Sequence, residues 1–326
     1  MDADNTLLIT RSEVARILKI EECMNAVEEA FKLQALGKVQ APKILGVHAE
    51  EGAYHIKAGL MKYFVAKSNA NFPGNPKKYG IPTIQGVIVV CDIHNGKMLA
   101  LMDSIEISII RTGAATGIAA KYLAKQNAKT ATICGCGNQG VISLKALLRV
   151  RQLEKVYVYD IDSVKKNDFA QSFAQESISI IPIDDLRKAT IQSDIIITCT
   201  PSKKPFLNIA DVKPGTFIAA VGSDNEDKQE LESSLIAISK LVVDSTEQCA
   251  TIGELHHALE NGVVMRNHVH AELGEIIAGK KISRTTDDEI IIFDSTGTAL
   301  QDVAAASIVY ETARINKIGL QLNLAS

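Results

Sequence analysis

The stretch Ala131-Thr132-Ile133-Cys134-Gly135-Cys136-Gly137-Asn138-Gln139-Gly140 decides the fold of this 326-residue chain. It joins a short β-branched run to a helical pattern that continues to about Val150. In a G-x-G-x-x-G turn, the first glycine makes the tight turn and the second lets a pyrophosphate approach the backbone. The third glycine lets the helix pack on the strand, and the helix N-terminus faces the phosphates. By itself such a turn is weak evidence, but its place between a strand and a helix predicts a dinucleotide site.

From Thr130 onward, short apolar runs alternate with helical segments, which is typical of a parallel sheet with helical crossovers. Six runs are expected to be strands, and a seventh β-like run precedes a long helix over Leu300–Ile315. The expected strands are Thr130–Cys134, Lys155–Tyr159, Ser179–Pro182, Asp194–Cys199, Thr216–Val221 and Leu241–Val243, with Glu289–Phe293 as the seventh. This order favours a Rossmann-type, doubly wound parallel sheet.

The first hundred residues have a different pattern. Asn25–Leu36 has apolar residues at helical spacing and a stop at Gly37. Ile81–Cys91 and Met98–Met102 flank an Asn-Gly turn and predict a hairpin. A helix over Thr112–Lys125, rich in small residues, then leads into the second domain. The expected fold class is therefore α/β, with an α+β domain beside the doubly wound sheet.

Composition excludes several classes of function. The formal net charge of −3 gives no basic surface for nucleic acid. No apolar run approaches the roughly 18 residues that span a bilayer, and the start of the chain, residues 1–4, is acidic where a signal peptide is basic. We expect a cytoplasmic protein with reduced thiols and no metal site, since none of its cysteines has zinc-ligand spacing. The six cysteines are Cys23, Cys91, Cys134, Cys136, Cys199 and Cys249.

Polar residues at the ends of the expected strands are candidate ligands of the dinucleotide, because ligands of such sheets bind beyond the carboxyl ends of the strands. Asp160 ends the second strand, where a carboxylate accepts the ribose hydroxyls of NAD and repels the 2′-phosphate of NADP. The alternative is that Asp160 caps the next helix, as Asp162 and Ser163 could. Thr200-Pro201-Ser202 follows the fourth strand and Gly222-Ser223-Asp224 follows the fifth.

Charged residues outside the glycine turn predict the chemistry. Asp224, at the end of a strand, can take a proton while a hydride leaves for a nicotinamide, although a loop aspartate can also simply make a turn. Lys43, Lys67 and Arg111 have mostly apolar or small neighbours and could pair with the carboxylate of a small acid, or could be solvated surface charges. The histidines at 256, 257, 268 and 270 form no triad with a nucleophile.

Together these motifs resemble the ornithine cyclodeaminase/mu-crystallin family, and within it the archaeal-type alanine dehydrogenases. The resemblance covers nearly the whole chain. It is carried by MNAVEEAFKLQALGK at 24–38, FPGNP at 72–76, RTGAATGIAAKYLA at 111–124, GCGNQG at 135–140, TPSKKP at 200–205, HAELGEIIAGK at 270–280 and DDEIIIFDSTGTALQDVA at 287–304. The end of the chain is also similar to the siderophore-pathway dehydrogenase of this family.

The resemblance implies a discontinuous substrate-binding and dimerisation domain at 1–118 and 305–326, and an NAD-binding Rossmann domain at 119–304. It implies a homodimer, a catalytic pair of Lys67 and Asp224, and substrate binding by Lys43, Lys57 and Arg111. The residues expected to bind NAD are Thr83, Arg111, Thr112, Gly135, Gly137, Asn138, Gln139, Asp160, Thr200, Pro201, Ser202, Val221, Gly222, Ser223, Thr296 and Gly297.

Two departures from the family pattern affect the substrate pocket. Tyr54 stands where the similar alanine dehydrogenases have an arginine, with Lys57 nearby as a substitute, and 225–227 (Asn-Glu-Asp) replace the usual proline-glycine.

The expected function is an NAD-dependent oxidoreductase that interconverts a small L-amino acid, or a cyclic or secondary one, and its keto or imino acid. The alternatives are an ornithine or lysine cyclodeaminase that uses NAD catalytically, and a mu-crystallin-like ketimine reductase or ligand-binding protein.

Overall fold

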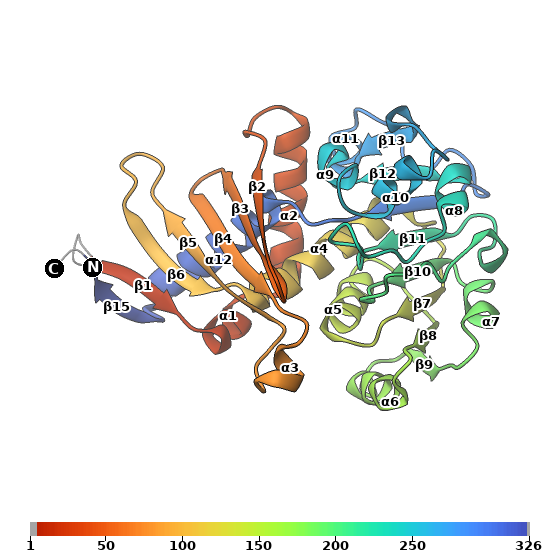
Figure 1. Ribbon diagram of the computed structural model, residues 1–326, viewed down its shortest axis with the longest axis horizontal. Helices are drawn as coiled ribbons and strands as arrows, with labels where there is room; N and C mark the ends of the chain where they lie inside the picture. The colour runs from red at the N-terminus through yellow and green to blue at the C-terminus, as the bar shows by residue number, and fades with distance from the viewer. Residues whose placement is uncertain (1–4, 325–326) are drawn as a thin grey trace. The chain divides into compact units, whose positions relative to one another are not determined.

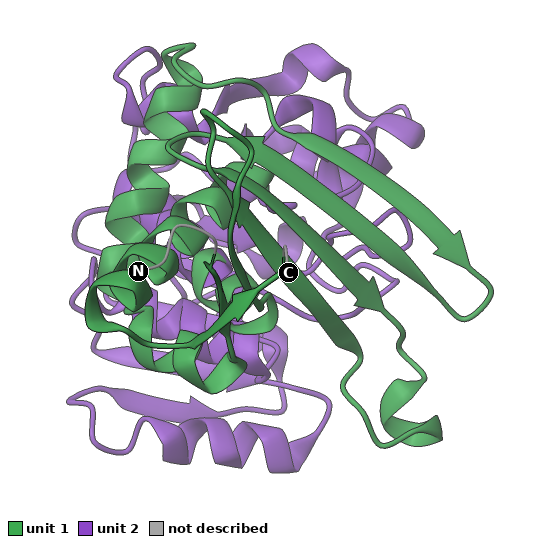
Figure 2. Ribbon diagram, turned by 90° about the vertical axis from the view of Figure 1, so that its left-hand side faces the viewer, with its two compact units in different colours: residues 1–111, 298–326 green, residues 112–297 purple. Residues whose placement is uncertain are grey.

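The computed structural model describes residues 5–324, so the acidic start of the chain lies outside the described residues. The chain forms two compact units, shown in two colours in Figure 2: residues 1–111 with 298–326, called unit 1, and residues 112–297, called unit 2. The sequence favoured divisions at 118/119 and 304/305. The observed divisions fall earlier because α12 (Ala299–Asn316) packs along its length on unit 1, and because α4 (Ile105–Leu123) crosses from one unit to the other.

Unit 2 is built on an eight-stranded sheet in which every neighbouring pair is parallel (Figure 1). The strand order is β13-β12-β14-β11-β10-β7-β8-β9. All seven strands expected from the sequence are present, so the Rossmann-type sheet is confirmed. Their bounds are β7 Thr130–Cys134, β8 Lys155–Tyr159, β9 Ser179–Pro182, β10 Ile195–Thr198, β11 Phe217–Ala220, β12 Lys240–Val243 and β14 Ile291–Asp294.

The eighth strand, β13 (Val269–Glu272), is not expected from the sequence. It is a four-residue edge strand that pairs only with β12, with an irregular register, and it lacks the continuous apolar run of a central strand. The helices of unit 2 are α5 Asn138–Leu147, α6 Ser163–Ser172, α7 Leu186–Thr190, α8 Ser233–Ile238, α9 Thr246–Cys249, α10 Glu254–Glu260 and α11 Leu273–Ile277. Two 3₁₀ turns cover Ile209–Asp211 and Arg266–His268.

The strand order of unit 2 reverses beside β7. The chain runs from β7 to β8 and β9 on one side, and then returns to place β10 on the other side. In doubly wound sheets the ligand crevice lies at this reversal, outside the carboxyl ends of the strands. A fully buried apolar core that includes Ile196, Ile218 and Ile292 holds these central strands in place.

Unit 1 contains a seven-stranded sheet in the order β15-β1-β6-β5-β4-β3-β2, in which only β1 and β6 pair in parallel. The bounds are β1 Asn5–Ile9, β2 Lys43–Ala49, β3 Gly52–Leu60, β4 Phe64–Asn71, β5 Ile84–Cys91, β6 Met98–Asp103 and β15 Leu320–Asn323. The helices are α1 Arg11–Ile17, α2 Ile20–Ala35, α3 Asn75–Lys78, α4 and α12. The expected α+β character and the β5–β6 hairpin are confirmed.

Two helices begin earlier than the sequence pattern indicated. Helix α2 begins at Ile20 rather than Asn25, because Cys23 and Met24 continue its buried face. Helix α4 begins at Ile105 rather than Thr112, because the Asp103 carboxylate accepts the backbone N–H groups of Ile105 and Glu106, at 2.9 and 3.3 Å. Asp103 is polar, so the pattern of apolar residues does not show that it begins the helix.

The two faces of the unit 1 sheet differ in how helices cover them. Helix α12 packs across β3, β4 and β5, with α2 packed on α12. The opposite face, called the open face, carries exposed large apolar side chains from all seven strands. These are Leu8, Leu45, Val47, Tyr54, Ile56, Leu60, Phe64, Val87, Met98 and Leu320.

Among the helices of residues 5–324, none has both the length and the apolar character that a membrane crossing needs.

The third glycine of the turn after β7 gives a test of the fold. A Cβ atom at residue 140 would lie 2.1 Å from the carbonyl oxygen of Gly135. We expect Gly140→Ala to lose about 1–3 kcal/mol of unfolding free energy in urea denaturation, because α5 must move away from the turn. A Cβ at Gly137 would meet nothing within 4 Å, so Gly137→Ala is the matched control, with a clearly smaller loss. Equal stability of the two variants would contradict this packing.

Candidate functional site

The turn after β7 has the three properties that a dinucleotide needs. Gly135 has φ +105°, and a Cβ there would lie 2.8 Å from the carbonyl oxygen of Cys199, the residue after β10. Gly140 is in close contact with the turn, as described above. Gly137 precedes α5, whose N-terminus has no side-chain cap, and open space surrounds its Cα. The backbone N–H groups at the start of α5 are therefore accessible to an anion.

Asp160 follows β8 and fixes the same turn. Its carboxylate accepts the backbone N–H of Cys136 at 2.8 Å and that of Asp162 at 3.0 Å. The cap of α6 is Asp162, whose carboxylate accepts from the backbone of Val164 and Lys165. The cap of the next helix is therefore Asp162 and not Asp160. Asp160 instead links the ends of β7 and β8.

A buried carboxylate joins the loops after β10 and β11. Glu230 accepts the backbone N–H and the hydroxyl of Thr200, at 2.6 and 2.7 Å, and the backbone N–H of Gly222 at 3.0 Å. Glu254, at the start of α10, in turn accepts the backbone N–H groups of Glu230 and Leu231, at 2.8 and 3.1 Å. Burial raises the pKa of both carboxyls. Sequence reasoning missed both residues, since neither lies in a motif or at the end of a strand.

The loop after β14 is held in a similar way. Asp244, which follows β12, accepts the hydroxyl of Thr296 at 3.0 Å and the backbone N–H of Gly297 at 2.6 Å. Gln248 of α9 also donates to the hydroxyl oxygen of Thr296, at 3.0 Å. These contacts position two of the residues that the sequence assigned to the cofactor.

Most of the expected cofactor residues thus lie at one edge of the sheet, because β7, β8, β10, β11 and β14 are parallel neighbours. The residues at this edge are Gly135, Gly137, Asn138, Gln139, Asp160, Thr200, Pro201, Ser202, Val221, Gly222, Ser223, Thr296 and Gly297. Three expected residues do not follow these strands: Thr83 and Arg111 belong to unit 1, and Thr112 lies within α4.

Asp224 lies at the same edge, in the loop after β11. Its carboxylate is 2.6 Å from the Lys228 ammonium, and its side chain is 48% exposed. The backbone of this loop is fixed from within, because the Ser223 hydroxyl donates to the carbonyl oxygen of Lys228. Asp224 is therefore placed by a held loop and remains accessible to solvent.

Unit 1 contains a buried cluster of opposite charges. The Lys67 ammonium of β4 lies 2.8 and 2.7 Å from the two carboxylate oxygens of Asp302 in α12. The Arg111 guanidinium of α4 lies 3.0 Å from Asp302 Oδ1 and donates to Gln301 Oε1 at 2.9 Å. All four side chains are buried. Sequence reasoning missed Asp302, although an acid beside Gln301 in the otherwise apolar run of 299–306 is a signal of a buried charge with partners.

The electrostatics of this cluster perturb the pKa of both partners. Burial, together with the charges of Arg111 and Lys57, lowers the pKa of Lys67 to about 7, against the attraction of Asp302. Burial acts to raise the pKa of Asp302, but Lys67 and Arg111 outweigh it and the pKa lies below its usual value. A lysine that releases its proton near neutral pH is suited to proton transfer.

Strand register decides which of the expected substrate residues come together. Lys57 is directly opposite Lys67 on the neighbouring strand, so both lie on the face covered by α12. Lys43 pairs with Ala58 and is exposed, which places it on the open face of the sheet. Tyr54 is three residues before Lys57 in β3. Because side chains alternate between the two faces of a strand, Tyr54 lies on the open face. The structure therefore brings Lys57, Lys67 and Arg111 together and leaves Lys43 apart.

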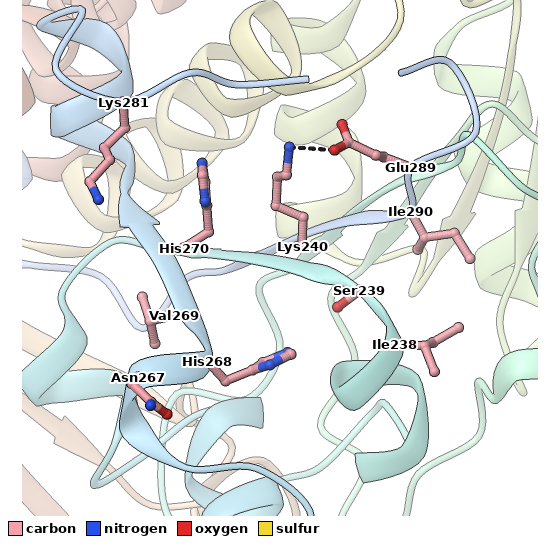
Figure 3. A pocket seen from close by; sticks show the side chains of 10 residues that line it. All are labelled: Ile238, Ser239, Lys240, Asn267, His268, Val269, His270, Lys281, Glu289 and Ile290. Carbon is pink, nitrogen blue, oxygen red and sulfur yellow. Dashed lines mark ion pairs between the residues drawn. The ribbon is translucent and has the colours of Figure 1, made fainter. Parts of the chain in front are cut away.

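A pocket of about 580 Å³ lies at the opposite edge of the unit 2 sheet (Figure 3). It is formed around the amino ends of β12 and β13, where Lys240 is 2.5 Å from Glu289. The Nε2 atoms of His268 and His270 form hydrogen bonds with the carbonyl oxygens of Ile236 and Ile282, respectively. Because ligands of doubly wound sheets bind at the carboxyl ends of the strands, this pocket is separate from the candidate site.

Comparison with known proteins identifies the relationship. The model of the ornithine cyclodeaminase/mu-crystallin family matches residues 4–317. The chain belongs to this family. The resemblance inferred from the sequence motifs is therefore confirmed, including the similarity to archaeal alanine dehydrogenases.

Three relatives of this family member show the extent of the match. An alanine dehydrogenase of Archaeoglobus fulgidus is 41% identical over 97% of this chain and 98% of its own length. The structure of an archaeal alanine dehydrogenase dimer with bound NAD is 40% identical, with a TM-score of 0.95, and covers 98% of this chain and 99% of its own. The Δ1-pyrroline-2-carboxylate reductase of Thermococcus litoralis, in complex with NADH and L-proline, is 34% identical, with a TM-score of 0.92, over 97% and 100% of the two chains.

The lowered pKa of Lys67 predicts how the stability of this family member depends on pH. Between about pH 7 and pH 10 the unfolded chain still binds the lysine proton that the folded chain has released, so the unfolding free energy gains a component that rises with pH. Urea denaturation across this range should show the component in the wild type and not in Lys67→Met. The exposed Lys38 provides the control, since Lys38→Met should keep the slope. An identical slope in Lys67→Met and the wild type would contradict the lowered pKa.

Proposed function

We propose that this chain is an NAD-dependent oxidoreductase that interconverts a small L-amino acid, or a cyclic or secondary amino acid, and its keto or imino acid. The observation that carries the proposal is the buried Lys67–Arg111–Asp302 cluster, in a chain whose other unit holds a dinucleotide turn. Relatives that bind NAD, or NADH with L-proline, at 40% and 34% identity support it. Unit 1 is then the substrate-binding unit and unit 2 the NAD-binding unit.

The turn after β7 fits NAD. The uncapped start of α5 offers backbone N–H groups to the pyrophosphate, and Gly137 leaves the space that the phosphates need. Asp160 adds a negative charge at the end of β8, which favours the ribose hydroxyls of NAD over the 2′-phosphate of NADP. When bound, NAD supplies the acceptor or donor of a hydride. The other residues expected from the sequence, Thr83, Arg111 and Thr112 included, complete the proposed binding set.

The residues of unit 1 suit a substrate with a carboxylate. Arg111 and Lys57 offer positive charge to it, and a carboxylate brought into a buried place must be paired with such charge. Lys67 exchanges a proton near neutral pH, and Asp224 of unit 2 is the second proposed acid–base group. We leave Lys43 out of the substrate set, because it is exposed on the open face.

The decisive experiment is a spectrophotometric panel. The purified chain is supplied with NADH or NADPH, one keto acid at a time and ammonium, methylamine or a diamine, and the reverse reaction is followed with amino acids and NAD. We expect consumption of NADH, with NADPH much less effective. Ammonia release from ornithine or lysine without net NADH formation would instead identify a cyclodeaminase. Binding of NADH without turnover of any substrate would identify a ligand-binding protein.

Asp224 is tested by a conservative substitution. Asp224→Asn keeps the size of the side chain but cannot transfer a proton, so turnover should fall by roughly 10²–10⁴-fold, while the affinity for NADH, measured by fluorescence titration, stays unchanged. Asp184 is an exposed acid elsewhere in unit 2 that also pairs with a lysine, Lys166, and Asp184→Asn should leave turnover unchanged. Wild-type turnover in Asp224→Asn would remove Asp224 from the mechanism.

We also propose that the active form is a homodimer, with the open face buried between two copies. Ten large apolar side chains exposed on one sheet face form a surface that water-soluble monomers rarely present. An alanine dehydrogenase relative is itself a dimer.

The cytoplasmic placement expected from the sequence is supported by six unpaired cysteines.

A charge on the open face tests the dimer. Val87→Asp places a carboxylate at the centre of the face, where a partner would have to bury it unpaired. Light scattering after size exclusion should then give the monomer mass, and the dimer mass for the wild type. Ile191→Asp is the matched control, because Ile191 is 43% exposed in unit 2 and Val87 is 40% exposed. A Val87→Asp dimer as tight as the wild type would contradict the open face as the interface.

A further inference from the structure

Helix α10 carries three side chains with metal-binding atoms close together. One ligand atom from each of His256, His257 and Glu260 lies within 4.8 Å of the other two. His256 Nε2 is 3.4 Å from Glu260 Oε2, and the centres of the two imidazole rings are 5.1 Å apart. The Glu260 side chain is 64% exposed, so it can turn toward an ion. No metal site is expected from the sequence, where these residues form no recognised spacing.

The hydrogen bonding of His257 prepares it to bind an ion. Its Nε2 atom lies 2.8 Å from the carbonyl oxygen of Lys228. A carbonyl oxygen only accepts, so Nε2 must carry the proton, and in the neutral ring the lone pair is then on Nδ1. In metal sites a ligating histidine almost always donates its other ring N–H to a carboxylate or a backbone carbonyl, which fixes the tautomer and the ring orientation. His257 already makes this supporting hydrogen bond.

We propose that His256, His257 and Glu260 bind one divalent transition-metal ion, of which Zn²⁺ is the representative. Two imidazoles and one carboxylate are a ligand set that zinc takes, with water in the remaining position. Imidazole ligands favour zinc, copper and nickel over magnesium and calcium, which prefer oxygen ligands. In this protein such an ion would be an addition to the proposed oxidoreductase activity, which needs none.

The site is linked to the loop that carries Asp224. Through His257 the ion would hold the carbonyl of Lys228, whose ammonium pairs with Asp224. The same helix holds the next residues, since Glu254 binds the backbone of Glu230 and Leu231. Substitution of His257 would therefore disturb this loop as well as the metal. His256 and Glu260 are the residues to change, because the bond from His257 to Lys228 does not depend on them.

The test is direct binding of Zn²⁺ to the full chain, freed of metal with EDTA and carrying no histidine tag. Isothermal titration should give one ion per chain. Co²⁺ in place of Zn²⁺ should give visible absorption bands that report nitrogen ligands. His256→Ala and Glu260→Gln should each weaken Zn²⁺ binding by at least about ten-fold, as even the loss of a supporting contact does at metal sites. His94→Ala, in the turn between β5 and β6, is the control and should bind as the wild type does.

Each other outcome overturns the proposal. A wild-type chain that binds no Zn²⁺ at millimolar concentration has no site, and a His256→Ala chain that binds like the wild type has its site elsewhere. Circular dichroism of each variant shows whether it is folded before the titration. No substrate or cofactor is present in this experiment, so its result is independent of the proposed oxidoreductase activity.

Discussion

The chemistry of unit 1 depends on one buried carboxylate. Asp302 lies between Lys67 and Arg111, and all three side chains are withdrawn from water. Two cations without a counter-ion would be costly to bury there, and removal of one partner of such a pair typically costs 3–5 kcal/mol. Arg111 and Lys57, together with Lys67 when it is protonated, outnumber this one carboxylate, and the positive charge left over suits the proposed recognition of an acid substrate. The same interaction restrains the fall in the pKa of Lys67, which would otherwise be larger.

Buried acids have a related structural role in unit 2. Glu230 holds Thr200 and Gly222, while Asp244 holds Thr296 and Gly297. In each case a side-chain carboxylate accepts backbone N–H and hydroxyl groups from loops that leave the carboxyl ends of strands. Loops are ordinarily the mobile part of such a sheet. Here these hydrogen bonds restrain the loops at the edge proposed to bind the dinucleotide, which reduces the ordering that binding must supply.

The layout of α10 extends this principle. Its first residue, Glu254, holds the backbone of Glu230 and Leu231, and one turn later His257 holds Lys228. One short helix therefore braces the segment after Asp224 at three residues, Lys228, Glu230 and Leu231. A side chain that interacts with α10 from the solvent side, or an ion bound there, acts on a segment that is adjacent in sequence to a proposed acid–base group.

The sequence by itself determined the Rossmann-type sheet, seven of its eight strands, the glycine turn and the family, because these depend on local patterns of apolar residues and glycines. It also placed Lys67 and Arg111 among the functional residues through motifs in their immediate neighbourhood. The partners of these residues were decided only by tertiary structure. Asp302 is 235 residues from Lys67 in the chain, and no local pattern records that pairing.

The tertiary structure also separated residues that the sequence grouped together. Lys43 and Lys57 were both expected at the substrate, but the antiparallel register of β2, β3 and β4 places them on opposite faces. Side chains alternate between faces along a strand, so a shift of one residue in register reverses the assignment. Local composition does not specify register. It follows from packing of β3, β4 and β5 against α12, and only the folded chain supplies that constraint.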